Sequence, residues 1–482
     1  MKTRHHPEKT YNGLTVVLSQ PSRKDLDNGY LISGYAGIIF NDALGRNATS
    51  RWSCDIRLAD SLAEPLREGT KAILLLGEGA LHTWCPKYLE YKISEIRGTP
   101  LESRWDIPVI CSFTPQDTCD IIDFEKKYNP LLAQEGEDED GEEGEEDTKK
   151  RHGFTQRKNY KFWFERDIDK VIHRIRGGEI YKNDYEIRIY PRMEDAIQAL
   201  NSLSDGDLFF DIETDSERNI TVVGFSCSNS NIIYSLPILD YLYALYYGKG
   251  TYRFFQTLVS CFQRNRVVIH NSMFDLKVLI YKYRLPIGRR VWDTMLVQKR
   301  IYPEPEKSLG HGLSCHPQIW EPYHKDEGIF EPQNRDQERK LLYYNAKDIV
   351  ALRLLKRAQE AFARNDPGLQ ASFEQANEMP YAFLINTFTG VRFDKEKADA
   401  QLAINDRLLD QYYRACRILV GPDVDYLPTS PKKVVDYFHG MLKYPVVARS
   451  KKTGEPSLGK EAMYKLMLKN PMNLVIEITL LY

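Results

Sequence analysis

Four acidic side chains and one tyrosine stand at positions from which they could act on a common group. Asp211 and Glu213 lie two residues apart in the apolar run DLFFDIET (207–214). Side chains alternate between the two faces of a strand, so both carboxylates are expected to point the same way. Burying carboxylates without a cation or a donor is costly. We therefore expect partners for them elsewhere in the chain.

The candidate partners follow along the chain. Asp275 lies just inside a predicted helix that follows the segment VVIHN, and Asp348 lies on a long predicted helix. Asp348 comes four residues before Leu352 and seven before Leu355, which places it on the apolar, inward stripe of that helix. Tyr344, one helical turn earlier, shares this face.

Four inward acids predict a site for divalent ions, because Mg²⁺ and Mn²⁺ prefer oxygen ligands. Two such ions about 4 Å apart can activate a water molecule and stabilise the departing 3′-oxygen in phosphodiester hydrolysis. The Tyr344 hydroxyl could orient the attacking water. Ser272 and Asp275 also fit a helix capping box, the structural alternative for Asp275. His270, beside this site, is expected to pack or to form hydrogen bonds.

The elements that must position these residues form a predicted α/β region over 185–365. Strands are predicted in YEIRIYP, DLFFDIET and RVVIHN, with two more in ITVVGFSCSNSNIIYSLPI. Helices are predicted in RMEDAIQALNSL, TYRFFQTLVSCFQRN and SMFDLKVLIYKY, and over the long segment from QERKLLYYNAKD to EAFARN.

The segments DIET, HNSMFD and YNAKD match, in order and spacing, the three motifs of the DEDD superfamily of 3′–5′ exonucleases. The Tyr-x3-Asp form of the third motif resembles the DEDDy branch, which includes the proofreading domain of DNA polymerase I. The resemblance implies an α/β, ribonuclease H-like exonuclease domain with a mixed sheet and flanking helices.

This resemblance also implies roles for single residues. It implies that Asp211, Glu213 and Asp348 hold one Mg²⁺ or Mn²⁺ ion, that Asp211 is shared with a second ion, and that Asp275 acts on that second ion. The catalytic set is then Asp211, Glu213, Asp275, Tyr344 and Asp348. Thr214 and Asn271 fall where the family contacts the terminal nucleotide of the substrate.

The N-terminal region, expected as an α/β domain over 10–180, resembles the uracil-DNA glycosylase superfamily more faintly. The resemblance rests on LTVVLSQPSRKDLDNGYLISGYAG, AILLLGEGAL, RGTP and PVICSFTPQDTCDI. Where that family carries a water-activating acid or amide, this chain has SQPSRKD, with only Gln20 and Asp25 nearby. Where the family has His-Pro, this chain has Thr114-Pro115, and threonine supplies no cation. We expect a catalytically silent domain that contacts DNA or a replication partner.

An acidic insertion interrupts this first region. Residues 135–147 contain ten acids and no base, and we expect disorder over 134–158 because like charges repel one another. Without these ten, 58 acidic residues stand against 66 basic ones, so the remainder is mildly basic and compatible with nucleic acid. The segment YKFWFERDIDKVIHRI is expected as an amphipathic helix that returns to the first domain.

The C-terminal region, residues 370–482, is expected to be mainly helical. EMPYAFLINTFTGVRFD, TSPKKVVDYF and KKTGEPSLGKEAMYKL resemble the beginning of the polymerase module of family A DNA polymerases, leading into the thumb. The motifs of nucleotide addition do not follow, so either a separate polymerase subunit is the partner or the chain is a truncated product. The apolar segment MNLVIEITLLY is a candidate contact surface for it.

The remaining features narrow the class of protein. The eight cysteines form no C-x2-C pair, which disfavours a zinc or iron–sulfur site. The N-terminus has no apolar signal segment and no run of about 18 apolar residues occurs, so a cytoplasmic protein without a membrane span is expected, in a bacterial or phage-infected cell.

The leading hypothesis is the 3′–5′ exodeoxyribonuclease, or proofreading, part of a family A DNA polymerase. It would act on single-stranded or frayed 3′ ends of DNA and release nucleoside monophosphates. A non-catalytic DNA-binding replication scaffold and a ribonuclease D-like RNA 3′ exonuclease are the alternatives. An active glycosylase is disfavoured by Thr114.

Overall fold

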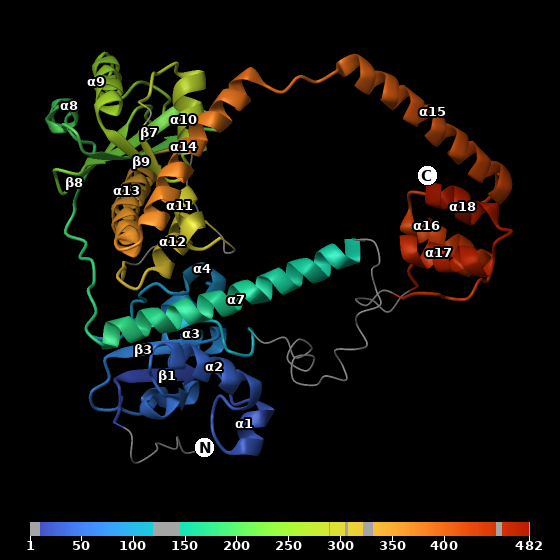
Figure 1. Cartoon of the computed structure of the whole chain (residues 1–482), viewed down its shortest axis with the longest axis horizontal. Helices are drawn as coiled ribbons and strands as arrows, with labels where there is room; N and C mark the ends of the chain where they lie inside the picture. The colour runs from blue at the N-terminus through green and yellow to red at the C-terminus, as the bar shows by residue number, and fades with distance from the viewer. Residues whose placement is uncertain are drawn as a thin grey trace. The chain divides into compact units, whose positions relative to one another are not determined.

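The structure is a computed structural model that describes residues 10–118, 145–288, 290–303, 307–321, 331–449 and 456–481, with the backbone alone over 145–159. The chain divides into two compact units. The first ends at Thr389 and contains both β-sheets, and the second comprises the segment from Gly390 onward together with the short segment Glu142–Thr148 (Figure 1). Within the described ranges no helix is both long and apolar enough to cross a membrane.

The first sheet is parallel, in the order β2-β1-β3-β4. Its strands are β1 (Leu14–Leu18), β2 (Asp55–Leu58), β3 (Ala72–Leu76) and β4 (Val109–Ser112). The central strands LTVVL and AILLL are apolar along nearly their whole length because helices cover both faces of a parallel sheet. Helices α2 (Gly34–Arg46) and α7 (Glu145–Ile175) cover one face, and α3 (Glu78–Trp84) and α4 (Ile93–Ile96) cover the other. The remaining short helices of this region are α1 (Arg23–Asn28), η1 (Arg51–Ser53), η2 (Ala59–Ala63) and η3 (Pro86–Tyr88).

Helix α7 confirms the predicted return to the first domain. Its apolar side chains Phe164, Ile168 and Val171 are buried in the core of the first sheet. Part of the range that was expected to be disordered, 145–158, belongs to the helical backbone of α7, while 134–144 lie outside the described residues. The sequence offers a reason, since acids at the beginning of this helix precede bases, an order that complements the helix dipole.

The second sheet is mixed, in the order β10-β9-β6-β7-β8-β5. Its strands are β5 (Glu186–Ile189), β6 (Asp207–Thr214), β7 (Ile220–Cys227), β8 (Ile232–Pro237), β9 (Arg266–Ile269) and β10 (Val291–Asp293). Strand β7 runs antiparallel to its neighbours β6 and β8, and the other pairs are parallel. Each strand predicted for this region is present, and the expected mixed α/β architecture with flanking helices is confirmed.

Helices flank this sheet on both faces (Figure 1). They are α8 (Met193–Ser202), α9 (Gly250–Arg264), α10 (Ser272–Lys277), the π-helix η5 (Val278–Lys282), α11 (Thr294–Ile301), α12 (Leu309–Cys315), α13 (Arg335–Ala363) and α14 (Pro367–Thr389). Phe210 and Ile212 of β6 pack with α8 and α9, whereas Phe209 packs in the cluster formed with α13. Because side chains alternate, the odd-numbered Asp211 and Glu213 lie on the α13 face.

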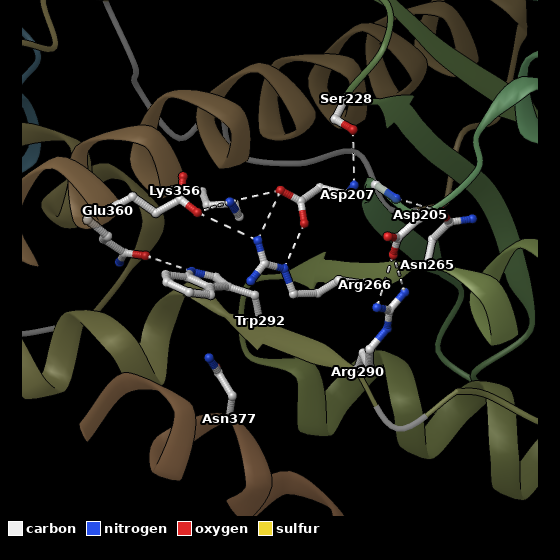
Figure 2. A network of polar contacts seen from close by, with 12 residues as sticks. Asp205, Asp207, Ser228, Asn265, Arg266, Arg290, Trp292, Lys356, Glu360 and Asn377 are labelled. Atoms are coloured by element: carbon white, nitrogen blue, oxygen red, sulfur yellow. Dashed lines mark hydrogen bonds and ion pairs between the residues drawn. The ribbon is translucent and has the colours of Figure 1, made fainter. Parts of the chain in front are cut away.

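A network of ion pairs lies at the end of the sheet where β6 begins. Figure 2 shows the carboxylate of Asp207 between the guanidinium group of Arg266 and the ammonium group of Lys356. The Arg266 Nε to Asp207 Oδ1 distance is 2.7 Å, and the Lys356 Nζ to Asp207 Oδ2 distance is 2.8 Å. Burial alone would raise the pKa of Asp207, but these two cations hold it below its ordinary value. This carboxylate is therefore neutralised within the protein.

A second buried ion pair joins the two sheets of the first unit. Arg97 forms a bidentate pair with Asp167 of α7, and both side chains are at most 1% exposed. The remaining Arg97 nitrogen, Nη1, donates a hydrogen bond to Ser314 Oγ of α12 at 3.0 Å. The ring of Trp163 lies 4.3 Å from the guanidinium carbon. The first sheet is thus fixed to a helix of the second.

The second unit is helical, as predicted for this region. It consists of α15 (Lys395–Val420), α16 (Pro431–Val435), the π-helix η6 (Asp436–Met441), α17 (Lys460–Lys469) and α18 (Leu474–Leu481). Phe438, Leu466 and Ile476 lie at the centre of its small core. Leu474 and Leu481 of the predicted contact segment are more than half exposed, while Val475 is buried.

Replacing Asp167 by alanine should destabilise the first unit by about 3–5 kcal/mol, because it leaves the buried Arg97 charge without its partner. Removing Glu102, which pairs with Lys87 at the surface, should change the stability far less, because water screens an exposed ion pair. Urea denaturation followed by circular dichroism measures both variants. Equal losses for Asp167→Ala and Glu102→Ala would contradict the importance assigned to the buried pair.

Candidate metal centre

Strand β6 and helix α13 bring three carboxylates together. One ligand atom from each of Asp211, Glu213 and Asp348 lies within 4.8 Å of the other two. Glu213 and Asp348 are each 8% exposed, and Asp211 is partly exposed. The structure thus brings together the three acids that the two-residue spacing and the helical stripe predicted to face one site, and their binding of a metal stays a prediction.

A glycine on the neighbouring strand lets α13 approach the sheet at this point. Asp211 pairs with Gly224 of β7 in the antiparallel ladder. A Cβ atom on Gly224 would lie 2.2 Å from Oδ1 of Asn345, so a larger residue here would displace the Asn345 side chain. The absence of a side chain at Gly224 thus makes room for Asn345 between α13 and the strand.

Asn345 is a site residue that the sequence reasoning missed. Its Nδ2 donates a hydrogen bond to Asp211 Oδ2 at 2.8 Å, and its Oδ1 accepts one from Ser235 Oγ at 3.0 Å. The side chain is fully buried. Asn345 therefore fixes the orientation of the Asp211 carboxylate. Its position three residues before Asp348, on the same helix face, was the available signal.

Asp275 lies close to this cluster but outside the group of three. Its Oδ1 accepts a hydrogen bond from the backbone N–H of Ile212 at 3.2 Å. Strand β6 pairs with β9 only over Asp207–Phe209, so the sheet provides no partner for Ile212 on that side. The Asp275 carboxylate accepts the hydrogen bond that a neighbouring strand would otherwise accept from Ile212. This hydrogen bond holds the carboxylate beside the strand that carries Asp211.

The capping-box alternative for Asp275 is wrong. The N-cap of α10 is Asn271, in the left-handed conformation with φ 60°, and no side chain caps the helix. The Ser272 hydroxyl instead donates a hydrogen bond to Asp293 Oδ2 at 2.6 Å. Ser272 therefore bonds to the buried Asp293 of another element and not to Asp275 of its own helix.

Asp293, at the end of β10, is a second residue that the sequence reasoning did not single out. Its carboxylate accepts hydrogen bonds from the backbone N–H groups of Asn271 and Ser272 and from that of Met295 in α11. It thereby fixes the turn in which Asn271 stands. His270, next to this turn, contacts Thr294 Oγ1 and the Lys307 carbonyl at 2.9 Å each, so its predicted hydrogen-bonding role is confirmed.

The electrostatics of the site contrast with those at Asp207. Burial, followed by the charges of Glu213, Asp275 and Asp348, raises the pKa of Asp211 well above its ordinary value. Burial also raises the pKa of Asp275. The strongest charges acting on Asp211 are thus all acidic, and the carboxylates must bind either protons or a cation. Oxygen donors of this kind suit Mg²⁺ or Mn²⁺.

The remaining predicted residues line the edge of this cluster. Burial and the nearby Asp348, Glu213 and Asp211 raise the pKa of Tyr344, which also hydrogen-bonds Asp348. Thr214 lines a pocket of about 550 Å³, together with Glu213, Asp215, Ser216, Arg218, Phe274 and Glu331. Asn271 is exposed at the beginning of α10.

No protein-family model and no curated protein matches the sequence. Solved structures with partial similarity include Trypanosoma brucei RNase D in complex with RNA U12, 14% identical over 40% of this chain and 70% of that chain, at a TM-score of 0.31. Brucella melitensis NrnC bound to pGG is 16% identical over 42% of this chain and 95% of that chain, at a TM-score of 0.33. The POL domain of Pol1 from M. smegmatis, with a DNA primer-template and dNTP, is 12% identical over 61% of this chain and 47% of that chain, at a TM-score of 0.44. These similarities are low, so the function must be inferred from the site itself.

Divalent ions should stabilise this protein through the acidic cluster. In EDTA, Asp211→Asn should melt at or above the temperature of the wild-type protein, because the substitution removes a repelling charge. With Mg²⁺ at about 100 times its dissociation constant, the wild-type protein should gain about 2.7 kcal/mol and Asp211→Asn much less. Thermal melting with and without Mg²⁺ or Mn²⁺ measures this difference. Equal responses of the two proteins would exclude the cluster as the metal site.

Proposed function

We propose that this chain is a metal-dependent 3′–5′ exonuclease that hydrolyses phosphodiester bonds and releases nucleoside monophosphates. The observation that carries the proposal is the cluster of Asp211, Glu213 and Asp348 within 4.8 Å, in which the strongest charges on Asp211 are acidic. Such a cluster costs stability unless a divalent cation neutralises it. The retention of buried acids therefore argues against a purely structural scaffold.

Each residue has a role in this proposal. Asp211, Glu213 and Asp348 hold one divalent ion, and Asp211 and Asp275 serve a second. When bound, these ions activate water and stabilise the departing 3′-oxygen. Tyr344, hydrogen-bonded to Asp348, orients the attacking water. Asn345 keeps the Asp211 carboxylate in place.

The substrate is a single-stranded or frayed 3′ end, because the reacting phosphate must reach carboxylates that are largely buried. The pocket beside Glu213 and Thr214, of about 550 Å³, has a volume typical of sites that bind small molecules and could receive one nucleotide. Thr214 contacts this terminal nucleotide from the pocket wall, and Asn271 contacts it from the turn before α10.

More specifically, we propose a proofreading exonuclease of a family A DNA polymerase, in the cytoplasm. Residues 185–365 would form its ribonuclease H-like exonuclease domain, 10–180 a glycosylase-like domain, and 370–482 a region that resembles the beginning of a polymerase module. The support is the resemblance of TSPKKVVDYF and KKTGEPSLGKEAMYKL to that module, which also favours DNA over RNA.

Within this proposal the first domain is catalytically silent. The Thr114 hydroxyl donates a hydrogen bond to Asp117 Oδ2 at 2.7 Å, so it is engaged in its own turn. A Cβ atom on Gly77 would lie 2.7 Å from the Thr114 methyl group, which therefore lies against the end of β3. Neither the hydroxyl nor the methyl group of Thr114 can therefore take the place of a cationic side chain that contacts a substrate.

The double substitution Asp211→Ala with Glu213→Ala should abolish cleavage while leaving the fold intact, because it removes ligands and mutual repulsion together. The assay follows a 5′-labelled single-stranded DNA with Mg²⁺, with and without EDTA, beside an RNA of the same sequence. The wild-type chain should shorten the DNA from its 3′ end only when the metal is present.

A matched control for this experiment lies at the opposite end of the same strand. Asp205 is an exposed aspartate in the left-handed conformation, and Asp205→Asn should retain wild-type cleavage. Degradation by the double variant at the wild-type rate would show that the site is wrongly assigned. DNA binding without any cleavage by the wild-type chain would favour the scaffold, and preference for the RNA would favour an RNA exonuclease.

Tyr344→Phe should slow cleavage about tenfold to a hundredfold, since groups that hold a metal ligand or position water have effects of this size. A metal-ligand variant such as Asp348→Ala should lose far more activity. Single-turnover rates at saturating Mg²⁺ compare the two variants. If Tyr344→Phe is as inactive as Asp348→Ala, the hydroxyl has a more central role than positioning water.

A further inference from the structure

An exposed aromatic turn follows strand β8 at the end of the sheet where the carboxylates lie. This turn comprises residues 239–245 (LDYLYAL), and Leu239 and Leu245 at its two ends form an antiparallel bridge. Leu242 is 70% exposed, Tyr243 50% and Leu245 55%. Three large apolar side chains so close together on a surface commonly mark a binding site.

The backbone of the turn is held in a conformation that tyrosine rarely adopts. Tyr243 has φ 60°, in the left-handed region, which is unfavourable for a bulky residue. The Asp240 carboxylate maintains the turn by accepting hydrogen bonds from the N–H groups of Leu242 and Ala244, at 2.9 Å each. Strain of this kind is concentrated at functional sites, and here it presents an aromatic ring to solvent.

The register of the sheet locates the turn relative to the carboxylates. Pro237, the last residue of β8, pairs with Val222, and Val222 pairs with Glu213. The three residues form one row across adjacent strands, so the turn leaves the sheet about 10 Å from Glu213.

Helix α13 holds the turn in place. The N–H group of Tyr241 donates a hydrogen bond to Glu338 Oε2 at 3.3 Å, and Glu338 is 1% exposed. Arg335 donates a hydrogen bond to the Tyr246 hydroxyl at 3.0 Å. The helix that carries Asp348 therefore also positions the aromatic turn.

The charges around Tyr243 determine what it can bind. Partial burial and the carboxylates of Glu331, Asp215 and Glu217 raise the pKa of its phenol. Glu331 and Asp215 also line the pocket beside Glu213, and the sheet register places the turn at the same end of the sheet as that pocket. These carboxylates repel phosphate groups, so a nucleic acid strand passing this point would present its bases rather than its backbone.

We propose that the turn 239–245 is a stacking platform for the bases of a single-stranded nucleic acid whose 3′ end lies in the pocket beside Glu213. Leu242 and Tyr243 supply the contact, which tolerates any sequence because every base has a π face. The platform rests on the proposed exonuclease function and deepens it, since it assigns an extended single strand as the substrate.

The test measures the KM for two DNA substrates of different length, with the wild-type chain and with a variant of the full chain. In Leu242→Ala with Tyr243→Gly, the glycine accepts the left-handed backbone without strain, so the fold is retained. The KM for an eight-nucleotide DNA strand should rise about tenfold, while the KM for a dinucleotide stays unchanged, because the dinucleotide fills only the pocket. Tyr252→Ala is the matched control, since Tyr252 is 71% exposed on α9, among the helices of the other face.

A second readout requires no cleavage. A 2-aminopurine base placed third from the 3′ end should be quenched when the strand binds the wild-type chain in EDTA, and the quenching should be lost in the double variant. If the wild-type chain cleaves both substrates and the double variant has wild-type KM and quenching, the platform is wrong while the exonuclease stands. If the wild-type chain cleaves neither substrate, the proposed function fails and the platform fails with it.

Discussion

Like-charge repulsion on strand β6 is the constraint on which the rest of this site depends. Asp207 and Asp211 stand on the same strand, yet Arg266 and Lys356 lower the pKa of the first, whereas burial and the acidic neighbours of the second raise its pKa. One carboxylate is neutralised by the protein, and the other is left to be neutralised from outside. That difference within four residues makes Asp211, and not Asp207, the candidate for binding a cation.

Several features of the fold keep the uncompensated carboxylates in place. Gly224 has no side chain, and the space admits Asn345, which holds Asp211 by a hydrogen bond. Asp275 replaces a ladder partner at Ile212, so the sheet itself positions it. Because these contacts come from β6, β7, α10 and α13, the cluster exists only when the sheet and both helices have assembled.

Periodicity was sufficient to predict the carboxylate cluster. Two-residue spacing placed Asp211 and Glu213 on one face, and the apolar stripe placed Asp348 inward. Periodicity places Asn345 on the same helix face as Asp348 but does not show its role, because that role depends on a glycine more than a hundred residues earlier in the chain.

Local patterns failed where a tertiary partner competed with them. Ser272 and Asp275 have the spacing of a capping box, but each bonds to a residue from another element. The contacts made by Asp293 and Ile212, which lie outside the local window, decided the structure there. The helical backbone from Glu145 likewise continues into a segment whose apolar side chains pack against the first sheet.

The first sheet contributes to the site without touching it. Arg97, fixed by Asp167, hydrogen-bonds Ser314 on α12. Two residues earlier, a Cβ atom on Gly312 would lie 3.0 Å from the Leu355 side chain, so α12 lies tightly against α13. Leu355 is two helical turns from Asp348 on the same face of α13. A continuous series of buried contacts therefore links the N-terminal region to the helix that supplies the third carboxylate, and this link requires no chemistry from the first sheet.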